Sequence, residues 1–173
     1  MAKTKEAIHF IITGGTIDSY YNGVKDTVEP TRESSVPAFI KSLKLNEQII
    51  FSQVCMKDSR ALNKNDISKI TDTVEKSIAK KIIITHGTYS MPDTARFLKI
   101  NLKRKDQTIV FTGSMIPLLG FAPSDASFNL GYALSEVQTL PPGIYVAMNG
   151  RVFQPEEVVK LLYEGRFISV FNK

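Results

Sequence analysis

Short apolar runs alternate with longer amphipathic stretches along most of the chain. Each run holds four to six residues rich in Ile and Val, which is typical of strands buried on both faces of a sheet. The pattern predicts strands over residues 8–13, 49–54, 81–85, 108–112 and 144–147.

The stretches between these strands carry helix signals. A helix capped by Asn63 is predicted with Ile67, Ile70, Val74 and Ile78 on its apolar face. Other helices are predicted over residues 35–43, 92–102, 124–136 and 158–163. The last prediction depends on Pro155 at the first helical position and on the glutamates that follow it. Residues 18–30 indicate a loop with a hairpin-like excursion, and residues 168–171 an edge strand.

Strands that alternate with helices of ten to fifteen residues need right-handed crossover connections. The predicted fold class is therefore α/β, with a mainly parallel sheet, helices on both faces, and a three-layer arrangement of the flavodoxin or Rossmann type. Residues 1–173 form one predicted domain, because the chain shows no internal boundary or repeat.

The composition and charge of the chain argue against a membrane protein and against a nucleic-acid-binding protein. The chain is 43% hydrophobic and 23% charged, its first seven residues are polar, and no apolar run approaches the ~20 residues of a membrane span. A cytoplasmic protein without membrane association is expected. The net charge of +5 comes from scattered residues, and the densest basic cluster, at 99–105, lies near a predicted helix end. Nucleic acid is therefore not the expected partner.

The sequence offers few ligands for a metal or a cofactor. Cys55 is the single cysteine, and the two histidines are His9 and His86. An internal disulfide is excluded, Cys55 is interpreted as a packed side chain, and a zinc site is not expected. No cofactor is predicted.

Two strand ends carry glycine followed by threonine. The first is Gly14-Gly15-Thr16, and the second is His86-Gly87-Thr88. In an open α/β sheet the carboxyl ends of the strands form the ligand site, so two hydroxyl groups are expected to converge there. The alternative is that these residues form a tight turn and a helix cap only.

The chain resembles the bacterial-type L-asparaginase family. The resemblance rests on Thr-Gly-Gly-Thr-Ile at 13–17, His-Gly-Thr at 86–88, Thr-Gly-Ser-Met at 112–115 and the stretch 124–130, in the family's order. It implies an amidohydrolase that releases ammonia from L-asparagine or a related ω-amide through a threonyl acyl-enzyme. The catalytic residues that it implies are Thr16 as nucleophile, Thr88, Lys160 and the lid tyrosine Tyr21. The implied substrate-binding residues are Gly15, Asp58, Ser59, Gly87, Tyr89 and Ser114.

Several of these assignments have structural alternatives. Lys160 is assigned by its spacing from Asn149 and could be a solvated helix residue; Tyr20 is a second candidate for the lid. Asp58 and Ser59 could only shape the turn before Asn63.

The chain also departs from the family pattern. Tyr89 stands where the family has an aspartate that holds the substrate's ammonium group, and the resemblance covers only the family's N-terminal domain. The site is therefore expected to be more open or completed in a homodimer, with a small amide as substrate. The alternatives are a catalytically impaired binding module for an amino acid and an amidase subunit of a larger amidotransferase.

Overall fold

The fold is a six-stranded sheet, seen in a computed structural model that describes residues 6–171. The strand order is β4-β1-β5-β6-β7-β8. The first five strands are parallel, and β8 is antiparallel to β7. The strands are β1 (Ile8–Gly14), β4 (Ile49–Lys57), β5 (Lys81–Thr85), β6 (Thr108–Thr112), β7 (Gly143–Met148) and β8 (Arg151–Phe153). The mainly parallel sheet expected from the sequence is confirmed.

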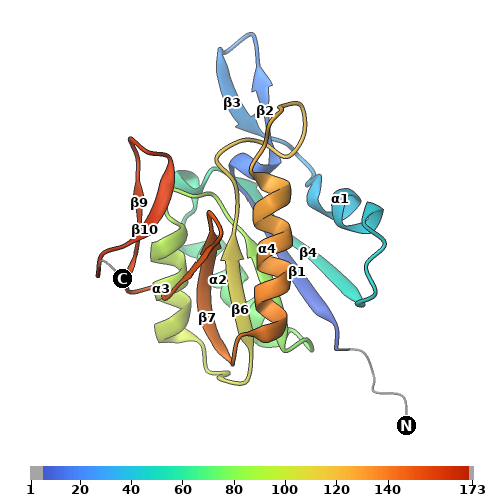
Figure 1. The fold of residues 1–173 in the computed structure, drawn as a ribbon, viewed down its shortest axis with the longest axis vertical. Helices are drawn as coiled ribbons and strands as arrows, with labels where there is room; N and C mark the ends of the chain where they lie inside the picture. The colour runs from blue at the N-terminus through green and yellow to red at the C-terminus, as the bar shows by residue number, and fades with distance from the viewer. Residues whose placement is uncertain (1–5, 172–173) are drawn as a thin grey trace.

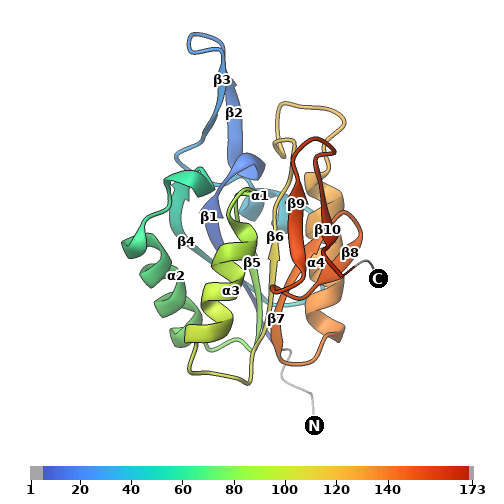
Figure 2. The ribbon, with the colours of Figure 1, turned by 90° about the vertical axis from the view of Figure 1, so that its left-hand side faces the viewer.

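Helices cover both faces of this sheet (Figures 1 and 2). The helices are α1 (Val36–Ser42), α2 (Lys64–Lys76), α3 (Met91–Asn101) and α4 (Ala126–Thr139). Two separate apolar clusters form the core, one under α2 and α3 and the other under α1 and α4. The three-layer α/β fold of a single domain is therefore confirmed.

The start of α2 matches the sequence prediction, whereas its end does not. The Asn63 side chain accepts hydrogen bonds from two backbone N–H groups of the first turn, and Asp66 accepts one from the Asn63 N–H. Ile78 was placed on the apolar face, but it is 87% exposed. The helix ends at Lys76, and Ser77 is extended, so the helical periodicity stops before Ile78.

The helix predicted over 158–163 is wrong. These residues form β9 (Val158–Leu161), which pairs antiparallel with β10 (Arg166–Ser169) in a separate hairpin. The edge strand expected at 168–171 is also wrong in position, because β10 pairs with β9 instead of the main sheet. Adjacent β-branched valines favour a strand, and Gly165, at φ 60°, allows the tight turn.

Loops gather at the carboxyl ends of the parallel strands, at the top of Figure 1. The short helix η1 (Thr16–Asp18) follows β1, and the hairpin of β2 (Ser19–Asn22) and β3 (Thr27–Pro30) projects beyond the sheet, as expected from the sequence. The hairpin is held where it joins the sheet by buried Asp18, which accepts hydrogen bonds from the Ser34 hydroxyl and the Ser35 N–H. Among residues 6–171, no helix is both long and apolar enough to cross a bilayer.

Candidate active site

The ends of β1 and β5 touch each other through two glycines. The strands pair in parallel up to Ile12 and Thr85. A Cβ added at Gly15 would lie 2.4 Å from the Gly87 Cα, so this contact requires glycine. Thr16 and Thr88 follow these glycines, and the structure therefore brings both predicted threonines to one edge of the sheet.

Thr88 is paired with Lys160. The residue is 4% exposed, and its Oγ1 accepts a hydrogen bond of 2.6 Å from the Lys160 Nζ. Burial lowers the pKa of the Lys160 ammonium, and the nearby positive charge of Arg60 lowers it further. Asp58 and Asp125 act in the opposite direction. A half-buried lysine with a lowered pKa, bonded to a buried hydroxyl, is suited to proton transfer.

Arg96 of α3 holds the strand that carries Lys160. Its Nε donates to the Pro155 carbonyl at 2.8 Å, and its Nη2 donates to the Val158 carbonyl at 3.0 Å. Its Nη1 pairs with Asp93 at 2.7 Å. The guanidinium thus satisfies backbone carbonyls at the start of β9. Sequence reasoning missed Arg96, because a helical arginine gives no local sign of a contact 60 residues away.

Two asparagines fasten the β9–β10 hairpin to β7. Asn149 has φ 55°, and its N–H donates to the Asn129 Oδ1 at 3.2 Å. The Asn149 Oδ1 accepts from the Phe167 N–H at 3.0 Å, which connects β10 to the end of the sheet. Asparagine tolerates positive φ better than most residues, and this preference was the available sequence signal.

His86 is fully buried between the strand end and the core. Its Nδ1 hydrogen-bonds the Gly87 carbonyl at 2.8 Å, and burial lowers its pKa to about 4, although the carbonyl opposes that shift. The ring is therefore neutral at pH 7 and donates from Nδ1. In a trans peptide the C=O and N–H groups point in opposite directions. His86 therefore turns the Thr88 N–H away from itself, toward the opposite side of the peptide.

Ser59 reaches the site from the short helix η2 (Ser59–Ala61). Its Oγ accepts from the Ser90 N–H at 3.3 Å, and the Ser90 hydroxyl donates to the Ser59 carbonyl at 2.9 Å. A Cβ on Gly87 would lie 2.7 Å from the Ser59 Cβ. Asp58 precedes this turn and accepts from the Arg60 N–H, so it also shapes the loop.

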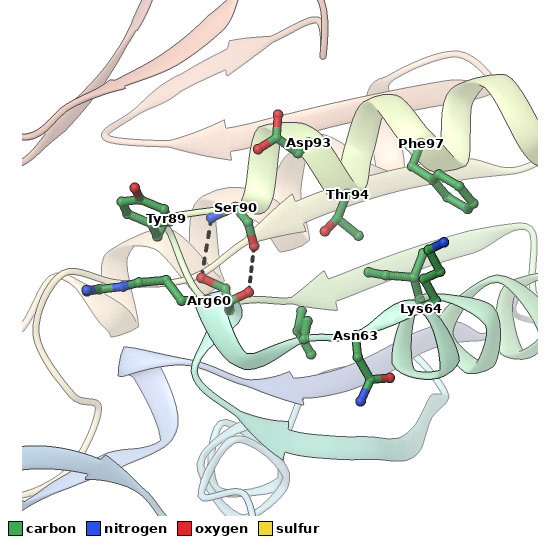
Figure 3. A pocket seen from close by; sticks show the side chains of 11 residues that line it. Arg60, Asn63, Lys64, Tyr89, Ser90, Asp93, Thr94 and Phe97 are labelled. Atoms are coloured by element: carbon green, nitrogen blue, oxygen red, sulfur yellow. Dashed lines mark hydrogen bonds between the residues drawn. The ribbon is translucent and has the colours of Figure 1, made fainter.

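Tyr89 lies beside Thr88 and is 54% exposed. The Arg60 guanidinium lies over its ring, 4.9 Å from the centroid, a cation–π distance. Figure 3 shows both side chains at one end of a cleft. Tyr89 stands where the family pattern has an aspartate, and it therefore brings no carboxylate to this side of the site.

Other predicted site residues are engaged elsewhere. The Tyr21 hydroxyl donates a hydrogen bond to Asp26 within the β2–β3 hairpin, and within residues 6–171 no hydrogen bond joins it to either threonine. The Ser114 hydroxyl donates to the Ile116 carbonyl at 2.6 Å. The Gly15 N–H, expected to bind the substrate, donates to a β4 carbonyl at 2.9 Å. In this structure Gly15 therefore provides close packing, and its donor is taken.

Cys55 is a packed thiol, and the described residues hold no cluster of metal-ligand side chains. Within residues 6–171, no three His, Cys, Asp or Glu side chains group closely enough to hold a metal ion. Burial raises the pKa of the Cys55 thiol to about 11, and its Sγ contacts the Thr13 carbonyl at 3.4 Å. Cys55 is thus protonated at neutral pH.

Comparisons with known proteins agree on one family. The protein-family model for the N-terminal domain of asparaginases matches residues 7–166. Glutaminase-asparaginase of Acinetobacter glutaminasificans is 29% identical over 169 residues, which cover 90% of this chain and 50% of the relative. L-asparaginase of Thermococcus kodakarensis is 36% identical over 80 residues, which cover 46% of this chain and 24% of that protein.

Solved structures give the same result. The thermostable L-asparaginase from Thermococcus kodakarensis superposes with a TM-score of 0.79 at 26% identity, over 95% of this chain and 51% of that one. The probable cytoplasmic L-asparaginase from Campylobacter jejuni superposes with a TM-score of 0.81 at 25% identity, over 95% of this chain and 53% of that one. The chain therefore spans about half the length of these structures. It belongs to the asparaginase family and corresponds to the N-terminal domain of that family.

Proposed function

We propose that this chain is an amidohydrolase that releases ammonia from an ω-amide through a threonyl ester. The observation that carries the proposal is the 2.6 Å contact between Lys160 and the buried Thr88, beside the strand end that presents Thr16. Thr16 is partly exposed, and its hydroxyl has no hydrogen-bond partner among residues 6–171. A partly exposed, unpartnered hydroxyl is available to a substrate.

The reaction begins with attack of the Thr16 Oγ on the amide carbonyl carbon. The proton of Thr16 passes to the neutral form of Lys160 through the Thr88 hydroxyl, and a tetrahedral oxyanion forms. The C–N bond then breaks, the nitrogen takes the proton, and ammonia leaves. Water hydrolyses the ester by the same proton route, so the products are the free carboxylate and the regenerated hydroxyl.

The lowered pKa of Lys160 gives this route its base. Proton transfer by a positioned group contributes roughly 10²–10⁴-fold to a rate, provided that the group is in the correct protonation state. The Thr88 N–H is the proposed oxyanion donor, because His86 fixes the peptide that carries it. Gly15 is not given this role, since its N–H already has a partner.

The relatives suggest the substrates to try first. Their names describe a glutaminase-asparaginase and L-asparaginases, and each is about twice the length of the matched region or longer. L-asparagine and L-glutamine are accordingly the starting panel, together with other ω-amides. The homodimer and the cytoplasmic location stay predictions; one relative is named as periplasmic.

Ammonia release by the purified chain tests the proposal. Lys160→Met should lower kcat by roughly 10²-fold or more, because the hydroxyl pair loses its base. Lys99→Met is a matched control, since Lys99 lies near the end of α3 and pairs with Glu156. Equal losses in both variants, or full activity in Lys160→Met, would refute the proposed role. Stabilisation by an amide without any turnover would instead indicate a binding module.

A further inference from the structure

An open cleft of about 720 Å³ extends from the candidate active site between η2 and the start of α2 on one side and α3 on the other. Its walls are mainly apolar, with Leu62, Ile67 and Phe97 among them. Figure 3 shows Tyr89 and Arg60 at one end and Phe97 at the other. Pockets of roughly 300–1,000 Å³ with this composition are typical of small-molecule sites.

The cleft is continuous with the site rather than separate from it. Ser59 and Ser90, which are hydrogen-bonded to each other, line its inner end. Tyr89 lines it as well, directly after Thr88, and also lines a second hollow that Lys160 borders. A molecule whose amide lies at the strand ends that carry Thr16 and Thr88 can therefore extend a substituent along the cleft.

The charges beside the cleft are unsuited to a free ammonium group. Arg60 lies at its inner end, and Lys160 borders the adjoining hollow. The carboxylates nearby already have cationic partners: Asp58 lies 3.6 Å from the Arg60 Nε, and Asp93 lies 2.7 Å from an Arg96 nitrogen.

A third carboxylate near Lys160 is also engaged. Asp125 accepts backbone N–H bonds from Met115 and Ile116, each at 2.9 Å for its nearer oxygen. None of these three carboxylates is therefore left as an unengaged partner for a substrate ammonium group.

We infer that the preferred substrate is an ω-amide amino acid whose α-nitrogen carries an apolar acyl group. Acylation removes an ammonium charge that has no unengaged carboxylate to pair with, and the acyl group occupies the cleft along Ile67 and Phe97. The substrate carboxylate can pair with the Arg60 guanidinium. The inference rests on the proposed function for its reaction and on the cleft for its specificity.

Competition between two amides tests this inference. N-benzoyl-L-asparagine should be hydrolysed with a kcat/KM at least about tenfold above that of L-asparagine. Phe97→Ala should raise KM for the benzoyl compound about tenfold. The matched control is Ile100→Ala, since Ile100 is 80% exposed on the same helix and does not line the cleft. Equal effects of both variants would overturn the inference.

A second variant tests the charge argument. Tyr89→Asp adds a carboxylate at the inner end of the cleft and should move the kcat/KM ratio at least about tenfold toward L-asparagine. An unchanged ratio in a folded variant would overturn the inference. Hydrolysis of L-asparagine alone, with no activity on the benzoyl compound, would overturn it and leave the proposed function intact.

Binding can be measured without turnover. N-benzoyl-L-aspartate has no amide to release as ammonia, so its effect on thermal stability reports the cleft alone. A rise in Tm that Phe97→Ala abolishes and Ile100→Ala retains would support the acyl site even if no amide were hydrolysed. No rise in Tm at millimolar ligand would overturn the inference whatever the hydrolysis assay shows.

Discussion

Replacing His86 by asparagine should flatten the dependence of stability on pH below neutrality. His86 is fully buried, and its pKa in the folded chain is about 4 against 6.5 for an ordinary histidine. Between these two values the unfolded chain binds more protons than the folded one, so the free energy of unfolding rises with pH. The stability that the folded chain has with a neutral His86 ring is fully present above pH 6.5, and it is lost as pH falls to 4. A depression of this size corresponds to about 3 kcal/mol.

Urea unfolding at several pH values between 4 and 7 measures this contribution. Asparagine does not titrate, and its amide can donate to the Gly87 carbonyl in place of the Nδ1. The difference between the parent and variant curves isolates His86, because His9 and the carboxylates titrate in both proteins. As pH falls from 7 to 4, the free energy of unfolding of the parent should fall by about 3 kcal/mol relative to that of the variant.

Two results would refute this reasoning. Parallel curves for the two proteins over the whole range would mean that His86 has the same pKa in the folded and unfolded chains. An NMR titration in which the His86 ring protonates near pH 6.5 in the folded protein would show the same. Either outcome would mean that burial does not lower the pKa of His86.

Three further predictions concern the strand ends and Lys160. Gly15→Ala should destabilise the chain by about 2–4 kcal/mol, since its Cβ would meet the backbone of the neighbouring strand end; Gly131→Ala, in open space on α4, should not destabilise it. Equal urea midpoints would contradict this. Arg96→Lys should lower kcat about tenfold with a small change in Tm, because β9 loses two of its anchors; an unchanged kcat would refute it. The rate should rise with pH through an apparent pKa below the usual 10.5 of Lys160, and Arg60→Gln should move that inflection upward; a pH-rate profile with no inflection below 10.5 would contradict this.

The core of the fold could be predicted because local patterns and the global fold agree there. The run at 108–112 became a strand with unchanged bounds, and Asn63 caps its helix. The region after Pro155 could not be predicted in this way. Its first-turn signals are typical of a helix, yet Arg96, 60 residues away in sequence, binds its backbone as part of a hairpin. Tertiary contacts of that kind leave no periodic pattern in the sequence.

The candidate site was predictable where glycine marked a close approach of two backbones. Thr16 and Thr88 are predicted for this reason and lie at one edge of the sheet. Lys160 is predicted by its spacing from Asn149, and it contacts Thr88 although its predicted helix is wrong. Tyr21 was not brought to the site, because a sequence cannot specify the direction in which an exposed hairpin projects. The cleft beside Tyr89 was missed for a similar reason, since its walls come from separate helices.

The proposed threonyl ester can be observed directly. Acid-quenched turnover mixtures with L-asparagine and with N-benzoyl-L-asparagine would be digested and mapped by mass spectrometry. We predict an adduct equal in mass to the substrate minus ammonia on the peptide that contains Thr16, and its disappearance together with ammonia release in Thr16→Ala. An adduct on Thr88, or undiminished ammonia release by Thr16→Ala, would contradict the assignment of Thr16 as the nucleophile.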